Sequence, residues 1–151
     1  MDDISLLLLK PEVVKKEKEI QQYLEKKGYT ILRKKKFSSW VSFVKKKYGE
    51  FSNEEREVYL SGYQKNKWGT TFIVFVLQHR QGDTLSILRR DLGHFIGYQD
   101  THEDSLRAKF GQGQKKNMIQ GKITFAYNGF HCPQDEEELQ EDFEILGMNL
   151  S

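Results

Sequence analysis

The apolar positions along the chain fall into two kinds of pattern, which predict alternating strands and helices. Two runs, 4–9 and 70–77, are almost continuously apolar and are typical of strands buried on both faces. The segment 29–37 alternates only partly and contains three lysines in a row, which favours a half-exposed strand. We therefore expect 4–9 and 70–77 at the centre of one sheet, with 29–37 nearer its edge.

Helical spacing recurs between these strands. Val13, Ile20, Tyr23 and Leu24 form an apolar stripe over 12–27, and Gly28 is a suitable residue to end that helix. Further helices are expected at 38–48, at 52–63 after a Ser-Asn-Glu-Glu capping box, at 83–92 and at 135–146. A polar loop with one helical turn is expected over 93–114, and a last strand over 122–130.

The resulting order, β-α-β-α-α-β-α-loop-β-α, limits the fold class. It fits a four-stranded antiparallel sheet with helices on one face, in the ferredoxin-like group of α+β folds. The chain has 151 residues, two prolines and no low-complexity segment, so we expect one domain over 1–151.

Charge changes this picture only locally. The net charge of +2 is too small to indicate a polyanionic partner, but lysines gather at 34–36 and 45–47, and 135–144 holds seven acids. Two solvated faces explain this pattern, and a basic face that docks on an acidic protein partner is the alternative. Nucleic-acid binding is disfavoured because no aromatic residues interleave with the lysines.

Cysteine content and hydropathy bear on location. Cys132 is the one cysteine, which excludes an internal disulfide and fits a reducing compartment. The N-terminus lacks a secretory-signal pattern, and the apolar run 6–9 is too short to cross a bilayer. We expect a cytoplasmic protein without membrane contact.

Candidate chemistry comes from cationic and aromatic residues that follow one another along the chain. They are Lys10, Tyr48, Arg89, Arg107, Asn128 and His131. Guanidinium groups suit phosphate because they stay charged and donate two parallel hydrogen bonds. Each residue alone is explained as a surface or core residue, but together they predict a shared anion site. The four histidines show no metal-ligand spacing, so no protein-held metal is expected.

These residues stand in a sequence that resembles the nucleoside diphosphate kinase family over about 4–146. The similarity is carried by Lys10-Pro-Glu after the first strand, by Arg89-Arg-Asp-Leu-Gly, and by Leu-Arg107-Ala-Lys-Phe-Gly. The resemblance implies that Lys10, Tyr48, Arg89, Arg107 and Asn128 bind nucleotide phosphates. It also implies that a strand-end histidine carries the phosphoryl group, and that Mg²⁺ arrives with the nucleotide.

Two alignments compete for the position of that histidine. Asn117-Met-Ile-Gln120 keeps the family's spacing from Arg107 but has glutamine, which cannot carry a phosphoryl group. Asn128-Gly-Phe-His131 has the histidine and leads directly into the acidic last helix, but it requires an insertion at 112–127. We favour His131, and we expect the insertion at the mouth of the nucleotide cleft.

Several departures from the family pattern predict impaired catalysis. Cys132-Pro-Gln replaces the Gly-Ser-Asp that would follow the histidine, and Asp142 stands where a longer glutamate would orient the ring. Phe95 replaces a phosphate-binding threonine, and Val58 stands nearest to the aromatic residue that would clamp the base.

Two functions remain open on these residues. One is a structural or binding subunit of a larger assembly, as degenerate domains of this family are in ciliary axonemes, with nucleotide binding and homo-oligomers compatible. The other is an active kinase that transfers the γ-phosphate of a nucleoside triphosphate to a diphosphate through His131. We favour the first.

Overall fold

The computed structural model describes residues 3–49, 53–93, 103–112, 116–119 and 122–149. Its main sheet is antiparallel and has the strand order β2-β3-β1-β6. The strands are β1 (Ser5–Leu9), β2 (Tyr29–Phe37), β3 (Phe72–His79) and β6 (Phe130–His131). The predicted four-stranded, ferredoxin-like α+β fold is therefore present, with β1 and β3 at the centre as expected.

Burial explains the strand order. Every residue of β1 is buried, and in β3 only Gln78 is exposed, as continuous apolar runs require. By contrast, β2 exposes most of its length, including its run of basic residues, and forms one edge. Lysines on an edge strand also oppose unwanted pairing with other chains.

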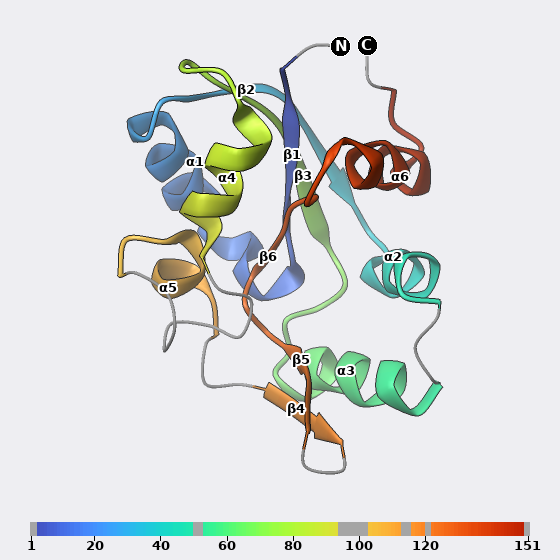
Figure 1. Cartoon of the computed structure of the whole chain (residues 1–151). Helices are drawn as coiled ribbons and strands as arrows, with labels where there is room; N and C mark the ends of the chain where they lie inside the picture. The colour runs from blue at the N-terminus through green and yellow to red at the C-terminus, as the bar shows by residue number, and fades with distance from the viewer. Residues whose placement is uncertain (1–2, 50–52, 94–102, 113–115, 120–121, 150–151) are drawn as a thin grey trace.

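Helices cover both faces of this sheet, which corrects the expectation that they lie on one face (Figure 1). On one face pack α1 (Glu17–Lys26), α4 (Thr84–Leu92) and α5 (Leu106–Phe110). On the other pack α2 (Trp40–Lys47), α3 (Asn53–Lys65) and α6 (Glu136–Leu146). The reason is the alternation within β1, where Leu6 and Leu8 enter one apolar cluster and Leu7 and Leu9 the other.

Most helix ends follow local sequence signals, but the starts of the first helix and of α4 differ from them. The first helical stretch begins as a 3₁₀ helix, η1 (Pro11–Lys16), before continuing as α1, and Gly28 ends it with a φ of +99°. Asp83, which precedes α4, makes no side-chain cap bond; Asp3 accepts from the Thr84 amide instead, at 2.9 Å. Ser52 of the predicted capping box lies outside the described residues.

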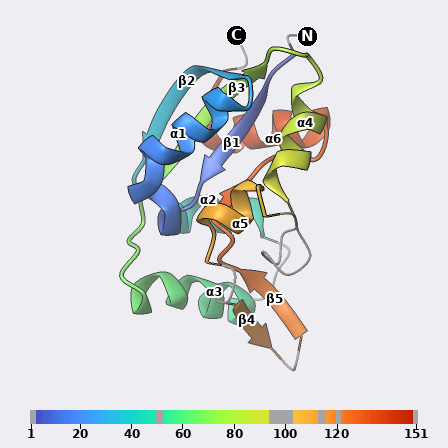
Figure 2. The same ribbon diagram turned by 90° about the vertical axis from the view of Figure 1, so that its left-hand side faces the viewer.

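The region before β6 differs from the prediction of one strand over 122–130. Its first part is β5 (Lys122–Ala126), which pairs with β4 (Lys116–Ile119) in a separate two-stranded sheet beside α3 (Figure 2). A turn at Gly129, with a φ of +87°, then leads into β6. The predicted helical turn around Leu106 is present as α5. No helix in the described ranges is long and apolar enough to cross a membrane.

Candidate functional site

The residues singled out by sequence meet where β1 ends and β6 begins. The Lys10 amide donates to the Gly129 carbonyl at 2.9 Å, and the Lys10 ammonium donates to Asn128 Oδ1 at 2.9 Å. These bonds exist because β6 runs antiparallel to β1, with Leu9 opposite Phe130. The strand-end lysine and the asparagine, 118 positions apart, thus form one buried pair.

Lys10 lies inside the protein rather than projecting into solvent. Its residue is only 8% exposed, and burial lowers the pKa of its ammonium to about 8, an effect that nearby Glu12 opposes and Arg107 adds to. Glu12 is buried as well, and burial raises the pKa of its carboxyl. Its Oε2 accepts from the Gly129 amide at 3.2 Å. Glu12 was missed at the sequence level, although it stands two positions after Lys10.

An aromatic cluster holds helix α3 over the Lys10–Asn128 pair. The Tyr127 hydroxyl donates to the Tyr59 carbonyl at 2.8 Å, and the two rings are stacked with centroids 5.4 Å apart. Tyr63 and Trp68 contact the Tyr127 ring from other sides, at 5.3 and 5.0 Å. The fit depends on Gly62, because a Cβ there would lie 1.8 Å from the Tyr127 hydroxyl.

Lys10 also lies beneath this cluster. Its ammonium is 5.9 Å from the centroid of the Tyr59 ring. The hydroxyls of Tyr59 and Tyr63 lie 2.7 Å apart, and burial, with the adjacent Glu12 charge, raises the pKa of both phenols well above the ordinary value. Tyr127 ends the predicted insertion, whose base is closed by a 2.7 Å bond from the Gln112 amide to the Tyr127 carbonyl.

Arg107 is held by backbone carbonyl groups. It lies on α5, whose N-terminus is capped by Ser105, and its two terminal nitrogens donate to Gly93 at 3.0 Å and to Phe130 at 3.2 Å. Its Nε is buried and has no hydrogen-bond partner in the described part of the chain. Burial, together with the nearby charge of Arg89, lowers the pKa of the guanidinium to about 10.

Arg89 and Tyr48 complete the predicted phosphate-binding set. Arg89 lies exposed in the last turn of α4, close enough to Arg107 for their charges to interact. Tyr48 follows the last residue of α2 and is half-buried; burial raises the pKa of its phenol to about 12. The charges of Asp142 and of Arg107 both act on the Tyr48 phenol, so Tyr48 lies near the histidine side and the arginine side of the site.

His131 is oriented by a buried carboxylate. Its Nε2 lies 2.8 Å from Asp142 Oδ2 on α6, and Asp142 is fully buried. Lys47 of α2 lies 2.7 Å from Asp142 Oδ1 and 2.8 Å from Glu138 Oε2. Although burial raises the pKa of Asp142, the bonds to His131 and Lys47 outweigh it and hold that pKa below its ordinary value. The aspartate therefore reaches the ring despite being shorter than glutamate.

The same three side chains, His131, Glu138 and Asp142, place ligand atoms within 4.8 Å of one another. They do not fit a protein-held cation, because the Lys47 ammonium already occupies the space between the two carboxylates and lies against an oxygen of each. Lys47 was missed at the sequence level, where it belonged to an apparently solvated run. Its spacing from Phe43 and Val44, which are buried on the same helix, was the available signal.

The structure also bears on the two alignments. Asn117 belongs to β4, which pairs with β5 outside the main sheet, whereas His131 pairs with Leu8 in the main sheet and leads into α6. Gln120 and Phe95 lie outside the described residues. Val58 is half-buried on α3. No ligand accompanies the chain, so the phosphate-binding roles of the predicted residues stay predictions.

Comparison with known proteins gives the same family. The family model "Nucleoside diphosphate kinase" matches residues 3–146. "Nucleoside diphosphate kinase homolog 5" of Homo sapiens is 28% identical over 128 residues, 81% of this chain and 56% of that protein. The Danio rerio protein of that name is 25% identical over 122 residues, 81% of this chain and 55% of its own length. The chain thus spans little more than half the length of these curated relatives.

Solved structures show the same fold. Nucleoside diphosphate kinase from Encephalitozoon cuniculi has a TM-score of 0.66 at 16% identity, covering 95% of this chain and 88% of the other. The Aquifex aeolicus nucleoside diphosphate kinase has a TM-score of 0.63 at 18% identity, covering 95% and 94%. With a family model matched over nearly the whole sequence, this chain belongs to the nucleoside diphosphate kinase family.

Proposed function

We propose that the chain is a catalytically impaired member of its family that serves as a structural or binding subunit of a larger protein assembly. The observation that carries this proposal is the closure of α3 onto Tyr127, above the buried Lys10–Asn128 pair. A lysine held in this way must leave its asparagine before it can reach a phosphate. Arg107 likewise donates two hydrogen bonds to backbone carbonyl oxygens, which a phosphate would have to replace.

The proposed setting is an assembly of the ciliary axoneme or cytoskeleton, with the protein in the cytoplasm or cilium. Its support is the resemblance to degenerate domains of this family. Protein partners and self-association are part of the proposal. Proximity labelling in ciliated cells tests the setting: recovery of axonemal proteins is expected, and a cytosolic set without them contradicts it.

An active kinase is the second candidate, and one observation favours it. The 2.8 Å contact between His131 Nε2 and Asp142 fixes the ring in one orientation. His131 Nδ1 has no hydrogen-bond partner within the described residues, so it could attack a γ-phosphate. In such a step, the nitrogen–phosphorus bond forms as the bond to the β-phosphate oxygen breaks, and the diphosphate leaves.

Labelling with γ-³²P nucleoside triphosphate and Mg²⁺ decides between the two. We expect little acid-labile, base-stable label on the chain, against full labelling of the Aquifex aeolicus enzyme under the same conditions. Rapid stoichiometric label that disappears in His131→Ala would establish the kinase instead. His79→Ala is a matched control, because His79 lies at the far end of β3.

The closure itself is testable by nucleotide binding. Tyr127→Leu removes the ring that packs over Gly62, so α3 should loosen and Mg²⁺–ATP should raise the melting temperature more than in the unchanged chain. Arg107→Ala in the same background should abolish that gain. If the unchanged chain binds nucleotide as tightly as Tyr127→Leu, closure of α3 does not explain impaired catalysis.

A further inference from the structure

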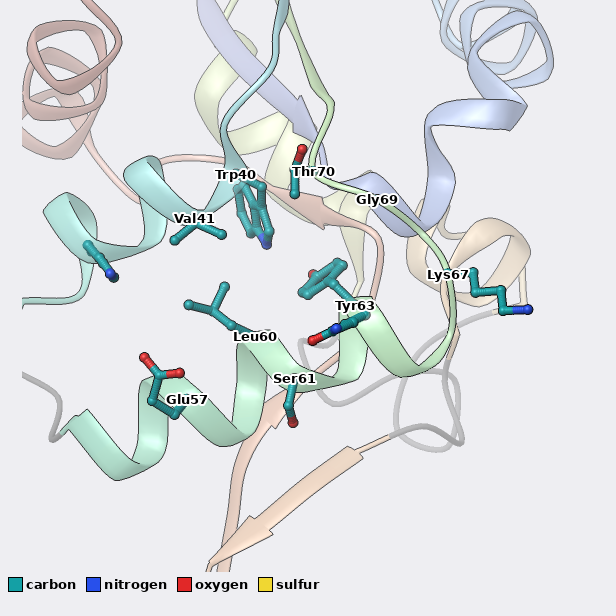
Figure 3. A pocket seen from close by; sticks show the side chains of 11 residues that line it. Trp40, Val41, Glu57, Leu60, Ser61, Tyr63, Lys67, Gly69 and Thr70 are labelled. Atoms are coloured by element: carbon teal, nitrogen blue, oxygen red, sulfur yellow. The ribbon is translucent and has the colours of Figure 1, made fainter.

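A concavity lies between α2, α3 and the segment that leads into β3, and of the aromatic residues around Tyr127 only Tyr63 is among its lining residues. It has a volume of about 640 Å³, which falls in the range of sites for small organic molecules. Its apolar lining comes from Trp40 and Val41 on α2 and from Leu60 and Tyr63 on α3 (Figure 3). None of the predicted phosphate-binding residues, nor His131, lines it.

One buried polar atom at this pocket is the Trp40 indole Nε1. It makes no hydrogen bond with any residue that the structure describes, and Figure 3 shows it directed between Leu60 and Tyr63. A buried N–H that lacks an acceptor is destabilising, and an indole can only donate. A ligand that brought an acceptor oxygen to this point would therefore make a bond that the free protein lacks.

The indole is held in this direction by its surroundings. The Trp40 amide donates to the Thr70 carbonyl at 2.8 Å, which fixes the start of α2 against the segment before β3. The ring stacks on Phe43 with centroids 5.4 Å apart and meets Phe72 edge-on at 5.4 Å. The rings that pack on the indole in this way hold its N–H in one direction. The pocket is thus preorganised for an acceptor.

Charge is confined to the rim. The ionisable lining residues Lys45, Glu57 and Lys67 are all exposed and carry both signs, whereas the apolar floor has no ionisable carboxylate or amine. This arrangement suits an uncharged body on the floor rather than a strongly anionic ligand such as a nucleotide. Ser61 and Thr70 add hydroxyl groups to the wall.

We propose that this pocket is a binding site for a small, planar, uncharged molecule whose carbonyl oxygen accepts a hydrogen bond from Trp40 Nε1. The aromatic body lies against Leu60, Val41 and the edge of Tyr63, and the carbonyl group points to the indole. The site does not rest on the proposed loss of kinase activity, since neither Tyr59 nor Gly62 lines it; Tyr63 contacts both the pocket and the Tyr127 ring.

Coumarin and chroman test the proposal, because they share one bicyclic skeleton and only coumarin has the carbonyl group. The chain has two tryptophans, so the ¹⁵N-labelled protein gives two indole N–H signals, which Trp40→Phe and Trp68→Phe assign. Coumarin should move the Trp40 signal downfield saturably and leave the Trp68 signal in place. It should bind roughly 2- to 12-fold more tightly than chroman, the range expected for one neutral hydrogen bond.

Variants separate the hydrogen bond to Trp40 from non-specific apolar binding. Trp40→Phe should reduce the coumarin-to-chroman preference to about one, while Trp68→Phe should keep it. Val41→Phe leaves the indole in place but narrows the pocket, so it should weaken the binding of both compounds. This variant tests the location of the site even if Trp40→Phe fails to fold. Equal binding of the two compounds by the unchanged chain, an unmoved Trp40 signal, or undiminished binding to Val41→Phe would each overturn the proposal.

Discussion

Gly62→Ala probes the closure of α3 most directly. In a helix, this substitution alone should stabilise by about 1 kcal/mol, because alanine is the better helix former. Here the added Cβ would lie 1.8 Å from the Tyr127 hydroxyl and 2.4 Å from its Cζ. The tyrosine cannot yield easily, since Tyr59, Tyr63 and Trp68 surround its ring. We therefore expect the opposite sign, a net destabilisation.

The size of this destabilisation follows from the interactions that Tyr127 would lose. Losing its hydrogen bond to the Tyr59 carbonyl costs about 0.5–1.5 kcal/mol, and losing the stacked pair costs a similar amount. Their sum agrees with the roughly 1–3 kcal/mol that overpacking typically costs. After the helix-propensity gain of about 1 kcal/mol is subtracted, Gly62→Ala should lower the free energy of unfolding by up to about 2 kcal/mol.

A double-mutant cycle makes this prediction sharp. In the Tyr127→Leu background the clash is absent, so Gly62→Ala should stabilise by about 1 kcal/mol, giving a coupling of roughly 1–3 kcal/mol. Urea unfolding of the four proteins measures it, and unchanged m-values would show that stability alone has changed. Melting temperatures should follow at about 2–4 °C per kcal/mol. If Gly62→Ala stabilises equally in both backgrounds, Tyr127 does not lie over Gly62 and the closed-site argument fails.

Three further outcomes are expected. The folded pKa of Lys10 is about 8, below its ordinary 10.5, so the unfolded chain binds more protons between these pH values. The free energy of unfolding should therefore rise by roughly 2–3 kcal/mol from pH 8 to pH 10. In urea titrations, Lys10→Met should show a smaller rise. The folded pKa of Asp142 is depressed, so the stability that its carboxylate contributes is present above about pH 4 and is lost on further acidification. Asp142→Asn should lower the free energy of unfolding by about 3–5 kcal/mol at pH 7 and make it depend less on pH below about 4. The same loss of stability in acid for Asp142→Asn and the unchanged chain would contradict this. Gly111→Ala should destabilise by about 1–3 kcal/mol in thermal melts, since its Cβ would lie 2.6 Å from the Asn128 carbonyl oxygen, whereas Gly49→Ala, with its nearest atom at 3.5 Å, is the near-neutral control.

Much of the fold could be predicted because its signals are local. Continuous apolar runs identified β1 and β3 as central strands, and the half-alternating segment identified β2 as an edge. Helices α1, α2, α4 and α6 began and ended near the expected residues, since periodicity and end signals act within a few positions. The strand predicted at 122–130 was wrong in extent, because the turn at Gly129 and the pairing of β5 with β4 depend on partners elsewhere.

The candidate site shows the same division. Lys10, Tyr48, Arg89, Arg107, Asn128 and His131 could be named from motif and order, and the structure brings them into one region. Their partners could not be named, since Glu12, Lys47 and the cluster around Tyr127 acquire meaning only through contacts between distant segments. That Asp142 reaches His131 also depended on how α6 packs against the sheet.

By itself, the sequence determined the family, the fold class and the candidate residues for phosphate binding, because these depend on residue type and order. Only the tertiary structure decided whether those residues face solvent or each other. Lys10 is a phosphate-binding candidate by sequence, yet it lies buried against Asn128 beneath α3. Whether a side chain is accessible, and at what pKa it titrates, is determined by the burial and charges that distant segments create around it.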